Sequence, residues 1–181
     1  PGWTLDLEGL AGHRSSMLGA VGLEPVSQKR FESRLAQRLA QLSGPVVILE
    51  GESRKVGDRI QPARVYQALE SGVAIELHAP LEDRLRVLRE DYLADERHLR
   101  ELAAALERLE LRLRLPEAER GLAARLARGE AEAVARTLLQ HHYDPLYFHA
   151  ERGKKYTWKQ DSSDPLAASR EVIRWIERSY R

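Results

Sequence analysis

The chain has 181 residues, of which 43% are apolar and 31% charged, and its formal net charge is +1 at pH 7. This length suits one domain with a core of ordinary size, and the small net charge restricts any nucleic-acid site to a local basic patch. The absence of cysteine excludes disulfides, thiolate metal sites and cysteine nucleophiles from these residues. No apolar run approaches the roughly 20 residues of a membrane span and no signal peptide is visible, so we expect a soluble, cytoplasmic protein without membrane partners.

The first predicted element is a short strand over residues 3–7, which leads into a polar loop that ends at Ser16. A strand followed by carboxylates, cations and glycines is typical of a functional loop in an α/β protein. The chain starts at Pro1 and not at Met, so we interpret it as a fragment of a longer protein.

Two more strands are predicted, each followed by a helix. Ser27 is expected to cap a helix that runs to Leu42, because apolar residues recur there at helical spacing. The unbroken apolar run 46–49 is typical of a strand buried on both faces. A short helix over 62–70, a third strand over 73–77 and a further helix follow. This alternation predicts the α/β class with a doubly wound parallel sheet.

The second half of the chain has a different pattern. From residue 93 to 142 no strand is predicted, and leucines three and four positions apart form one apolar seam that Pro116 ends. We predict an α/β core over residues 1–92 and a helical bundle or lid subdomain over residues 93–142. Residues 143–181 are expected to add a basic segment and a C-terminal helix.

Acidic residues follow the predicted strands. In an open parallel sheet the ligand lies beyond the carboxyl ends of the strands, where Asp6 and Glu8 follow the first strand and Glu50 and Glu52 the second. An apolar strand followed by an acid resembles a Walker B element, whose carboxylate holds Mg²⁺ directly or through water, so Glu50 is a candidate Mg²⁺ ligand. Alternatively, Asp6 caps a helix, and Glu52 with Ser53 caps a turn.

His13 and Arg14 are candidates for a phosphate or diphosphate clamp, with Arg14 as a bidentate donor and His13 as a donor or proton shuttle. Alternatively, they stabilise their own loop through backbone carbonyls. The phosphate cradle G-x-x-x-x-G-K-[ST] does not occur in the sequence, since the Gly-Lys pair at 153–154 lacks the flanking residues. We expect the cradle to precede the first strand. The histidines lack zinc-site spacing, so no zinc is predicted.

Five motifs occur in order along the chain. They are Asp6-Leu7-Glu8-x-Leu10-Ala11-x-His13-Arg14, Ser27-Gln28-x-x-Phe31-Glu32, Glu50-x-Glu52-Ser53-x-x-Val56-Gly57 with Pro62, Arg84 with Asp91-Tyr92, and His142-Tyr143-Asp144-Pro145-x-Tyr147. Together they resemble the successive motifs of tRNA 2-selenouridine synthase. In that family an N-terminal rhodanese-like domain with a catalytic cysteine precedes a P-loop domain. The chain is similar to the P-loop domain without its first strand and its P-loop.

The resemblance implies a P-loop NTPase-like fold and a selenium transferase. The implied reaction replaces sulfur by selenium at the wobble 2-thiouridine of tRNA, through S-geranyl-2-thiouridine, to give 2-selenouridine. Selenophosphate and geranyl diphosphate are the implied co-substrates, and the tRNA anticodon stem-loop and the rhodanese domain are the implied partners. We expect the fragment alone to be inactive.

We predict roles for individual residues of the site. The predicted catalytic residues are Asp6, Glu8, His13 and Arg14, and the predicted phosphate or nucleotide ligands are Ser16, Glu50, Glu52, Ser53 and Arg84. An exposed helix position is the alternative for Arg84. The family usually has glycine where this chain has Ser15, and a positive φ there would cost serine roughly 1 kcal/mol.

Residues 152–159 combine cations with aromatic rings, which suits RNA because cations contact phosphates and rings stack on unpaired bases. The predicted tRNA-binding residues are Arg152, Lys154, Lys155, Tyr156, Trp158 and Lys159. A basic surface hairpin is the alternative. For the chain as a whole, the alternatives are a P-loop small-metabolite kinase and a non-catalytic tRNA-binding module.

Overall fold

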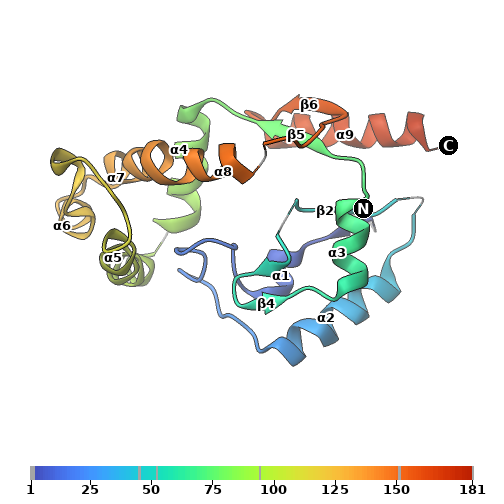
Figure 1. Ribbon diagram of the computed structural model, residues 1–181, viewed down its shortest axis with the longest axis horizontal. Helices are drawn as coiled ribbons and strands as arrows, with labels where there is room; N and C mark the ends of the chain where they lie inside the picture. Colours follow the sequence, from blue (N-terminus) through green and yellow to red (C-terminus); the bar gives the residue numbers. More distant parts are fainter. Residues whose placement is uncertain (1–2, 45, 52, 94, 151, 181) are drawn as a thin grey trace. The chain divides into compact units, whose positions relative to one another are not determined.

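The computed structural model describes residues 3–44, 46–51, 53–93, 95–150 and 152–180 (Figure 1). Glu52, one of the predicted phosphate ligands, lies outside the described residues. The chain forms two compact units, the first reaching to Leu77 and resuming at Tyr156, and the second running from His78 to Lys155. None of the described helices is both long and apolar enough to cross a membrane.

The first unit contains a parallel strand pair. Strand β1 (Thr4–Leu5) pairs with β2 (Ile48–Leu49), with Thr4 opposite Ile48 and Leu5 opposite Leu49. Helix α2 (Gln28–Gln41) lies between them in the sequence, and the Ser27 hydroxyl accepts a hydrogen bond from the Arg30 amide at 3.3 Å. The predicted Ser27 cap and the parallel relation of the first two strands are thus confirmed.

The segment after β1 is more regular than the predicted loop. Helix α1 (Leu7–Ala11) starts directly after Asp6, whose carboxylate accepts a hydrogen bond from the Gly9 amide at 2.6 Å. Gly12 ends the helix with a φ of 64°, in the left-handed region that glycine adopts without steric cost. The helix-cap alternative for Asp6 is thus confirmed, and the predicted strand over residues 3–7 ends earlier than expected, at Leu5.

Helices α1 and α2 and strands β1 and β3 share one hydrophobic core. Its buried members are Leu5, Leu7, Ala11, Val26, Phe31, Leu35 and Val56. Phe31 and Leu7 have no exposed surface. This core fixes the ends of the segment that carries His13 and Arg14, since Ala11 and Val26 flank it in the sequence.

A hairpin that sequence patterns did not reveal follows β2. Strands β3 (Lys55–Val56) and β4 (Arg59–Ile60) pair antiparallel around Gly57, which has a φ of 57°. The Gln28 side chain donates to the Ile60 carbonyl at 2.9 Å and accepts from the Ile60 amide at 2.8 Å. The hairpin is thus joined to the start of α2. Helix α3 (Ala63–Glu70) comes next.

The third predicted strand pairs differently from expectation. Among the described residues, β5 (Ile75–His78) pairs with β6 (Trp158–Asp161), so the strands form three two-stranded sheets in place of one doubly wound sheet. Strand β6 lies within the predicted basic segment. The mixed α/β class is confirmed.

Local contacts explain why β6 is the partner of β5. The Thr157 amide donates to the Ala74 carbonyl at 2.9 Å, and the Lys159 ammonium lies 2.6 Å from the Glu76 carboxylate. Trp158 stacks on Trp175 of helix α9 (Pro165–Ser179), with ring centroids 6.1 Å apart. Two of the residues in these contacts, Trp158 and Lys159, were predicted to bind tRNA.

The second unit is helical in its described residues beyond β5. Its elements are α4 (Leu81–Tyr92), α5 (Glu96–Glu110), the 3₁₀ turn η1 (Glu117–Glu119), α6 (Leu122–Ala127), α7 (Ala131–Leu138), the π-helical turn η2 (Leu139–Tyr143) and α8 (Asp144–Ala150). Helix α4 packs beside α7, and α5 packs against α6 (Figure 1). Buried leucines at 102, 106, 109, 122 and 138 form its interior.

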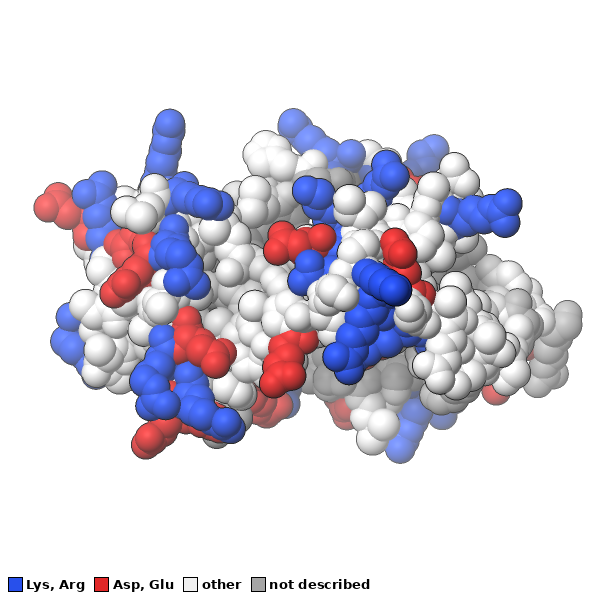
Figure 2. Space-filling model, turned by 90° about the horizontal axis from the view of Figure 1, so that it is seen from below, with Lys and Arg blue, Asp and Glu red and all other residues white. Residues whose placement is uncertain are grey.

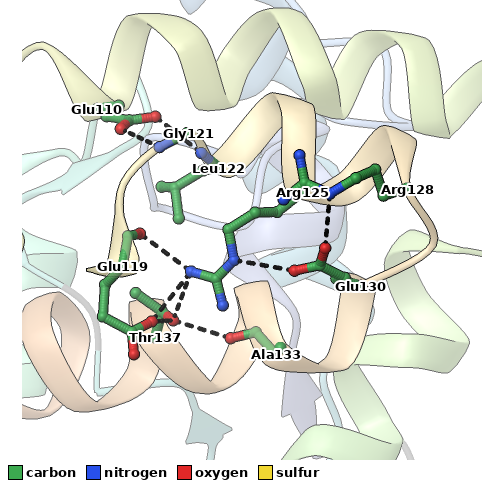
Figure 3. Close-up of polar contacts among 9 residues, drawn as sticks. All are labelled: Glu110, Glu119, Gly121, Leu122, Arg125, Arg128, Glu130, Ala133 and Thr137. Carbon is green, nitrogen blue, oxygen red and sulfur yellow. Dashed lines mark hydrogen bonds and ion pairs between the residues drawn. The ribbon is translucent and has the colours of Figure 1, made fainter. Parts of the chain in front are cut away.

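A buried arginine joins three of these elements (Figure 3). The Arg125 guanidinium has 12% of its side-chain surface exposed and lies 3.0 Å from the Glu119 carboxylate and 3.3 Å from that of Glu130. The Thr137 hydroxyl also donates to Glu119, and this contact, together with Arg125, lowers the pKa of Glu119. A pocket next to Arg125 is lined by charged residues that are paired with one another, including Arg125 with Glu119 and Glu130, as expected of a structural network.

The charged side chains are mixed on the face drawn in Figure 2, where Lys and Arg alternate with Asp and Glu. This distribution agrees with the formal net charge of +1. A nucleic-acid contact on such a protein must therefore come from a local group of cations and not from a uniform field.

Candidate functional site

Two carboxylates meet at the carboxyl ends of β1 and β2. Because the strands are parallel with Leu5 opposite Leu49, the next residues, Asp6 and Glu50, are neighbours, and the Asp6 carboxylate is close enough to raise the pKa of Glu50. The Glu50 carboxylate also accepts from the Leu7 amide at 3.0 Å. The structure thus brings together two predicted site residues at the start of α1.

The environment of Glu50 favours its protonated form. Burial is the largest cause that raises the pKa of Glu50, and the neighbouring Asp6 carboxylate raises it further. The Leu7 amide acts in the opposite direction, because it donates to the ionised carboxylate. A proton on Glu50 or a cation beside it would relieve the repulsion between the two acids.

His13 is held between two glycines from different segments. A Cβ atom added at Gly19 would lie 2.8 Å from His13 Cε1, and one added at Gly57 would lie 2.5 Å from His13 Cγ. Carbon atoms do not approach this closely, so the imidazole fits only because both positions are glycine. The ring therefore joins the loop over residues 12–26 to the turn of the β3–β4 hairpin.

The neighbouring polar residues stabilise the same loop. Arg14 donates from Nη1 to the Val21 carbonyl at 2.9 Å, and its amide donates to the Gly19 carbonyl at 3.0 Å. The Ser16 hydroxyl accepts from the Leu18 amide at 3.2 Å. The contact of Arg14 with a backbone carbonyl matches the loop-stabilising alternative, and a phosphate role for His13, Arg14 and Ser16 stays a prediction.

Ser15 has a φ of 49° and is the one non-glycine residue with a positive φ among the residues that the structure describes. The family usually has glycine at this position, and the structure shows the positive φ at which serine is expected to be less stable than glycine. The Ser15 hydroxyl is buried and has no hydrogen-bond partner within the described part of the chain. Both features cost stability, because L-residues disfavour this conformation and a buried hydroxyl loses its water.

The other predicted phosphate ligands are more dispersed. Glu8 lies in the first turn of α1, and the Ser53 hydroxyl donates to the Lys55 carbonyl at 2.9 Å, as the turn-capping alternative expects. Arg84 belongs to the second unit and forms a two-pronged ion pair with Asp144, in which Nη1 lies 3.2 Å from Oδ2. The alternative prediction for Arg84 was an exposed helix position, but only 34% of its side-chain surface is exposed and its guanidinium is paired with Asp144.

The residues assigned to tRNA are in different environments. Arg152, Lys154 and Lys155 are exposed. Lys159 is paired with Glu76, and Trp158 is half-buried against Trp175. Tyr156 is also half-buried. The cations at 152–155 are thus better placed for a polymer ligand than the aromatic residues that follow them.

Several residues that shape the site had no predicted role. Gly57 belongs to one of the five motifs, so the sequence marked it as a residue of interest, whereas Gly19 belongs to none of them. Asp144 was likewise in a motif, but nothing in the sequence paired it with Arg84. Among the described residues, no group of three or more His, Asp or Glu side chains is arranged to hold a metal ion.

The parallel strand pair, the acid after each strand and the attached helical unit fit an α/β domain of the AAA class. The sequence model described as "tRNA 2-selenouridine synthase AAA domain" matches residues 3–128. The chain therefore belongs to the tRNA 2-selenouridine synthase family.

Curated relatives carry the same name. The tRNA 2-selenouridine synthase of Cupriavidus pinatubonensis is 31% identical over 177 residues, which cover 81% of this chain and 48% of that protein. That of Pseudomonas syringae pv. syringae is 28% identical over 202 residues, covering 93% of this chain and 54% of the relative. The chain thus spans about half the length of these relatives. No solved structure matches it at a significant level.

Replacing Ser15 by glycine should stabilise the protein by about 1 kcal/mol, because glycine adopts the positive φ without a Cβ clash. Urea unfolding of the intact enzyme measures this difference. Ser15→Ala is the matched control, since it removes the buried hydroxyl and keeps the Cβ atom. Equal gains in the two variants would show that backbone strain is not the cause.

Replacing Glu50 by glutamine should change how stability depends on pH. A carboxyl whose pKa is raised on folding contributes stability that is present below its unfolded pKa and is lost as pH rises through the folded value. The Glu50→Gln variant lacks this loss, so its stability relative to the parent should increase with pH across that range. Unfolding at several pH values tests this, with the exposed Glu70→Gln as control. A constant difference would contradict it.

Gly19→Ala should displace the His13 imidazole, at a cost of roughly 1–3 kcal/mol for an overpacked site. The imidazole resonances of His13 in protein labelled at histidine report the displacement. Gly51→Ala serves as the control, because a Cβ there meets no atom within 4 Å. Unchanged His13 resonances in Gly19→Ala would contradict the close packing of His13 against Gly19 and Gly57.

Proposed function

We propose that the chain is part of a tRNA-modifying transferase that replaces sulfur by selenium at wobble 2-thiouridine, through S-geranyl-2-thiouridine, to give 2-selenouridine. The observation that carries this proposal is the family match over residues 3–128. Relatives named tRNA 2-selenouridine synthase support it. Selenophosphate and geranyl diphosphate are the proposed co-substrates, and a rhodanese-like domain is the proposed partner in the intact protein.

The loop over residues 12–26 is proposed to bind the phosphate groups of these co-substrates. Both co-substrates carry negative charge, and the Arg14 guanidinium and the His13 imidazole supply donors on one short loop. The packing of His13 between Gly19 and Gly57 supports this role, because a donor that is held in place binds without reordering.

The Asp6–Glu50 pair is proposed as the acidic component of the site. It can hold a proton on Glu50 or accept Mg²⁺, since carboxylate oxygens are the ligands that Mg²⁺ prefers. The two carboxylates suit Mg²⁺ as oxygen donors, because each has a second oxygen beyond the one bonded to the α1 amides. When bound, Mg²⁺ would neutralise diphosphate charge.

The reaction is tested with the intact enzyme that contains this chain. The enzyme is incubated with 2-thiouridine tRNA, geranyl diphosphate and selenophosphate, and the digested nucleosides are identified by mass spectrometry. 2-Selenouridine is the expected product. Phosphorylation of a small hydroxyl compound without any tRNA change would favour a kinase, and tRNA binding unaffected by Asp6→Asn or Glu50→Gln, with no modified nucleoside, would favour a binding module.

Exchanging Lys154 and Lys155 for alanine should weaken tRNA binding by the intact enzyme, because both side chains are exposed cations. Each lost phosphate contact should reduce the slope of log affinity against log salt by about 0.7, the value for single-stranded nucleic acid. Lys159→Ala should have a smaller effect, since this ammonium is paired with Glu76. Lys29→Ala, an exposed lysine of α2, is the control. A salt slope unchanged in the double variant would rule out phosphate contacts at these positions.

A further inference from the structure

Helix α8 exposes three consecutive large apolar side chains. Leu146, Tyr147 and Phe148 have 53%, 60% and 69% of their surfaces exposed. Three consecutive helical residues span more than half of the helix circumference, so α8 has apolar groups in water on most of its sides. Exposed apolar groups that adjoin one another mark binding surfaces more often than isolated ones do.

Cations follow these side chains in the same unit. Arg152, Lys154 and Lys155 are exposed, and none forms an ion pair with a carboxylate among the described residues. Their charges are therefore available to an external anion. Exposed rings and exposed cations within one short segment are a combination that suits unpaired nucleotides, because every base has a face for stacking and every nucleotide a phosphate.

An ion pair fixes the start of α8. Asp144 is the first residue of this helix, and its two carboxylate oxygens accept from the two terminal nitrogens of Arg84 on α4. Such a two-pronged pair fixes orientation as well as distance. The π-helical turn η2 ends directly before Asp144, and π-turns are frequent at functional sites.

We propose that Tyr147, Phe148, Arg152, Lys154 and Lys155 form a surface for unpaired nucleotides of RNA, here called the α8 surface. The rings stack on bases, the cations contact phosphates, and the Arg84–Asp144 pair positions α8. Arg84 is thereby a positioning residue and not a phosphate ligand. The identification of this RNA as the anticodon loop of tRNA rests on the proposed function.

RNA fits the α8 surface better than a protein partner does. A protein interface core is depleted of lysine, whereas the aromatic pair of α8 is followed within seven residues by one arginine and two lysines. Phosphate groups complement all three charges. A contact with another part of the same enzyme is the competing outcome of the test.

The rings are tested in the intact enzyme with Tyr147→Ala and Phe148→Ala. Affinity is measured for an anticodon stem-loop RNA and for a blunt RNA duplex. We expect each substitution to weaken stem-loop binding roughly tenfold, the loss of one stacked base, and to leave duplex binding unchanged. Phe148→Tyr should retain binding because it keeps the ring. Leu111→Ala is the control, as Leu111 is an apolar side chain of the same unit with 88% exposure.

Unchanged stem-loop affinity in both alanine variants would overturn the proposal. So would unchanged affinity accompanied by a lower melting temperature, which would show that α8 packs against another part of the enzyme. Stem-loop binding that depends on Phe148 in an enzyme that makes no 2-selenouridine would refute the proposed function and leave the α8 surface intact. Normal product formation with unaffected binding in the variants would refute only the surface.

The role of Arg84 is tested by exchanging the charges. Arg84→Asp should weaken stem-loop binding, and the double variant Arg84→Asp/Asp144→Arg should recover most of the affinity, because the ion pair forms again with its direction reversed. A residue that binds phosphate itself would show no recovery. Circular dichroism of each variant confirms that the helices are retained, and failure of the double variant to regain affinity while folded would refute the positioning role.

Discussion

The pairing of β1 with β2 is the constraint on which the first unit depends. Two residues on each strand suffice to place Asp6 beside Glu50, because parallel strands end at the same edge. Both carboxylates then bond amides at the start of α1, which allows the chain to turn from strand to helix. The two acids thus stabilise the start of α1 in addition to any chemical role. Burial raises the pKa of Glu50, and the nearby Asp6 carboxylate is a smaller cause in the same direction.

Arginine side chains in both units contact acceptors within the protein, although two of them, Arg14 and Arg84, were predicted to bind phosphate. Arg125 is enclosed by carboxylates, Arg84 orients α8 through Asp144, and Arg14 bonds a carbonyl of its own loop. The planar guanidinium is suited to each task because it can satisfy several acceptors at once. Arg152, Lys154 and Lys155, which form no ion pair among the described residues, are therefore better candidates for RNA contacts than Arg84 and Arg125, which are paired with carboxylates.

Sequence patterns predicted the elements that depend on local rules. The Ser27 cap and the strand at 48–49 follow from capping and from apolar runs. The positive φ at position 15 was considered only because the resembled family usually has glycine there. The β3–β4 hairpin was missed because two-residue strands show no alternation. Strand β6 was missed because Trp158 and Lys159 look like RNA ligands until Trp175 and Glu76 are placed next to them. Contacts between distant residues, such as His13 with Gly19 and Gly57, require the fold itself.

The amide of Gln28 has a consequence for the solubility of the hairpin. By donating to and accepting from the backbone of Ile60, it acts as one residue of an additional strand would. The outer edge of β4 is therefore already satisfied at this position and offers no free template to a strand of a neighbouring molecule. A single side chain at the start of a helix thus protects a sheet edge against aggregation.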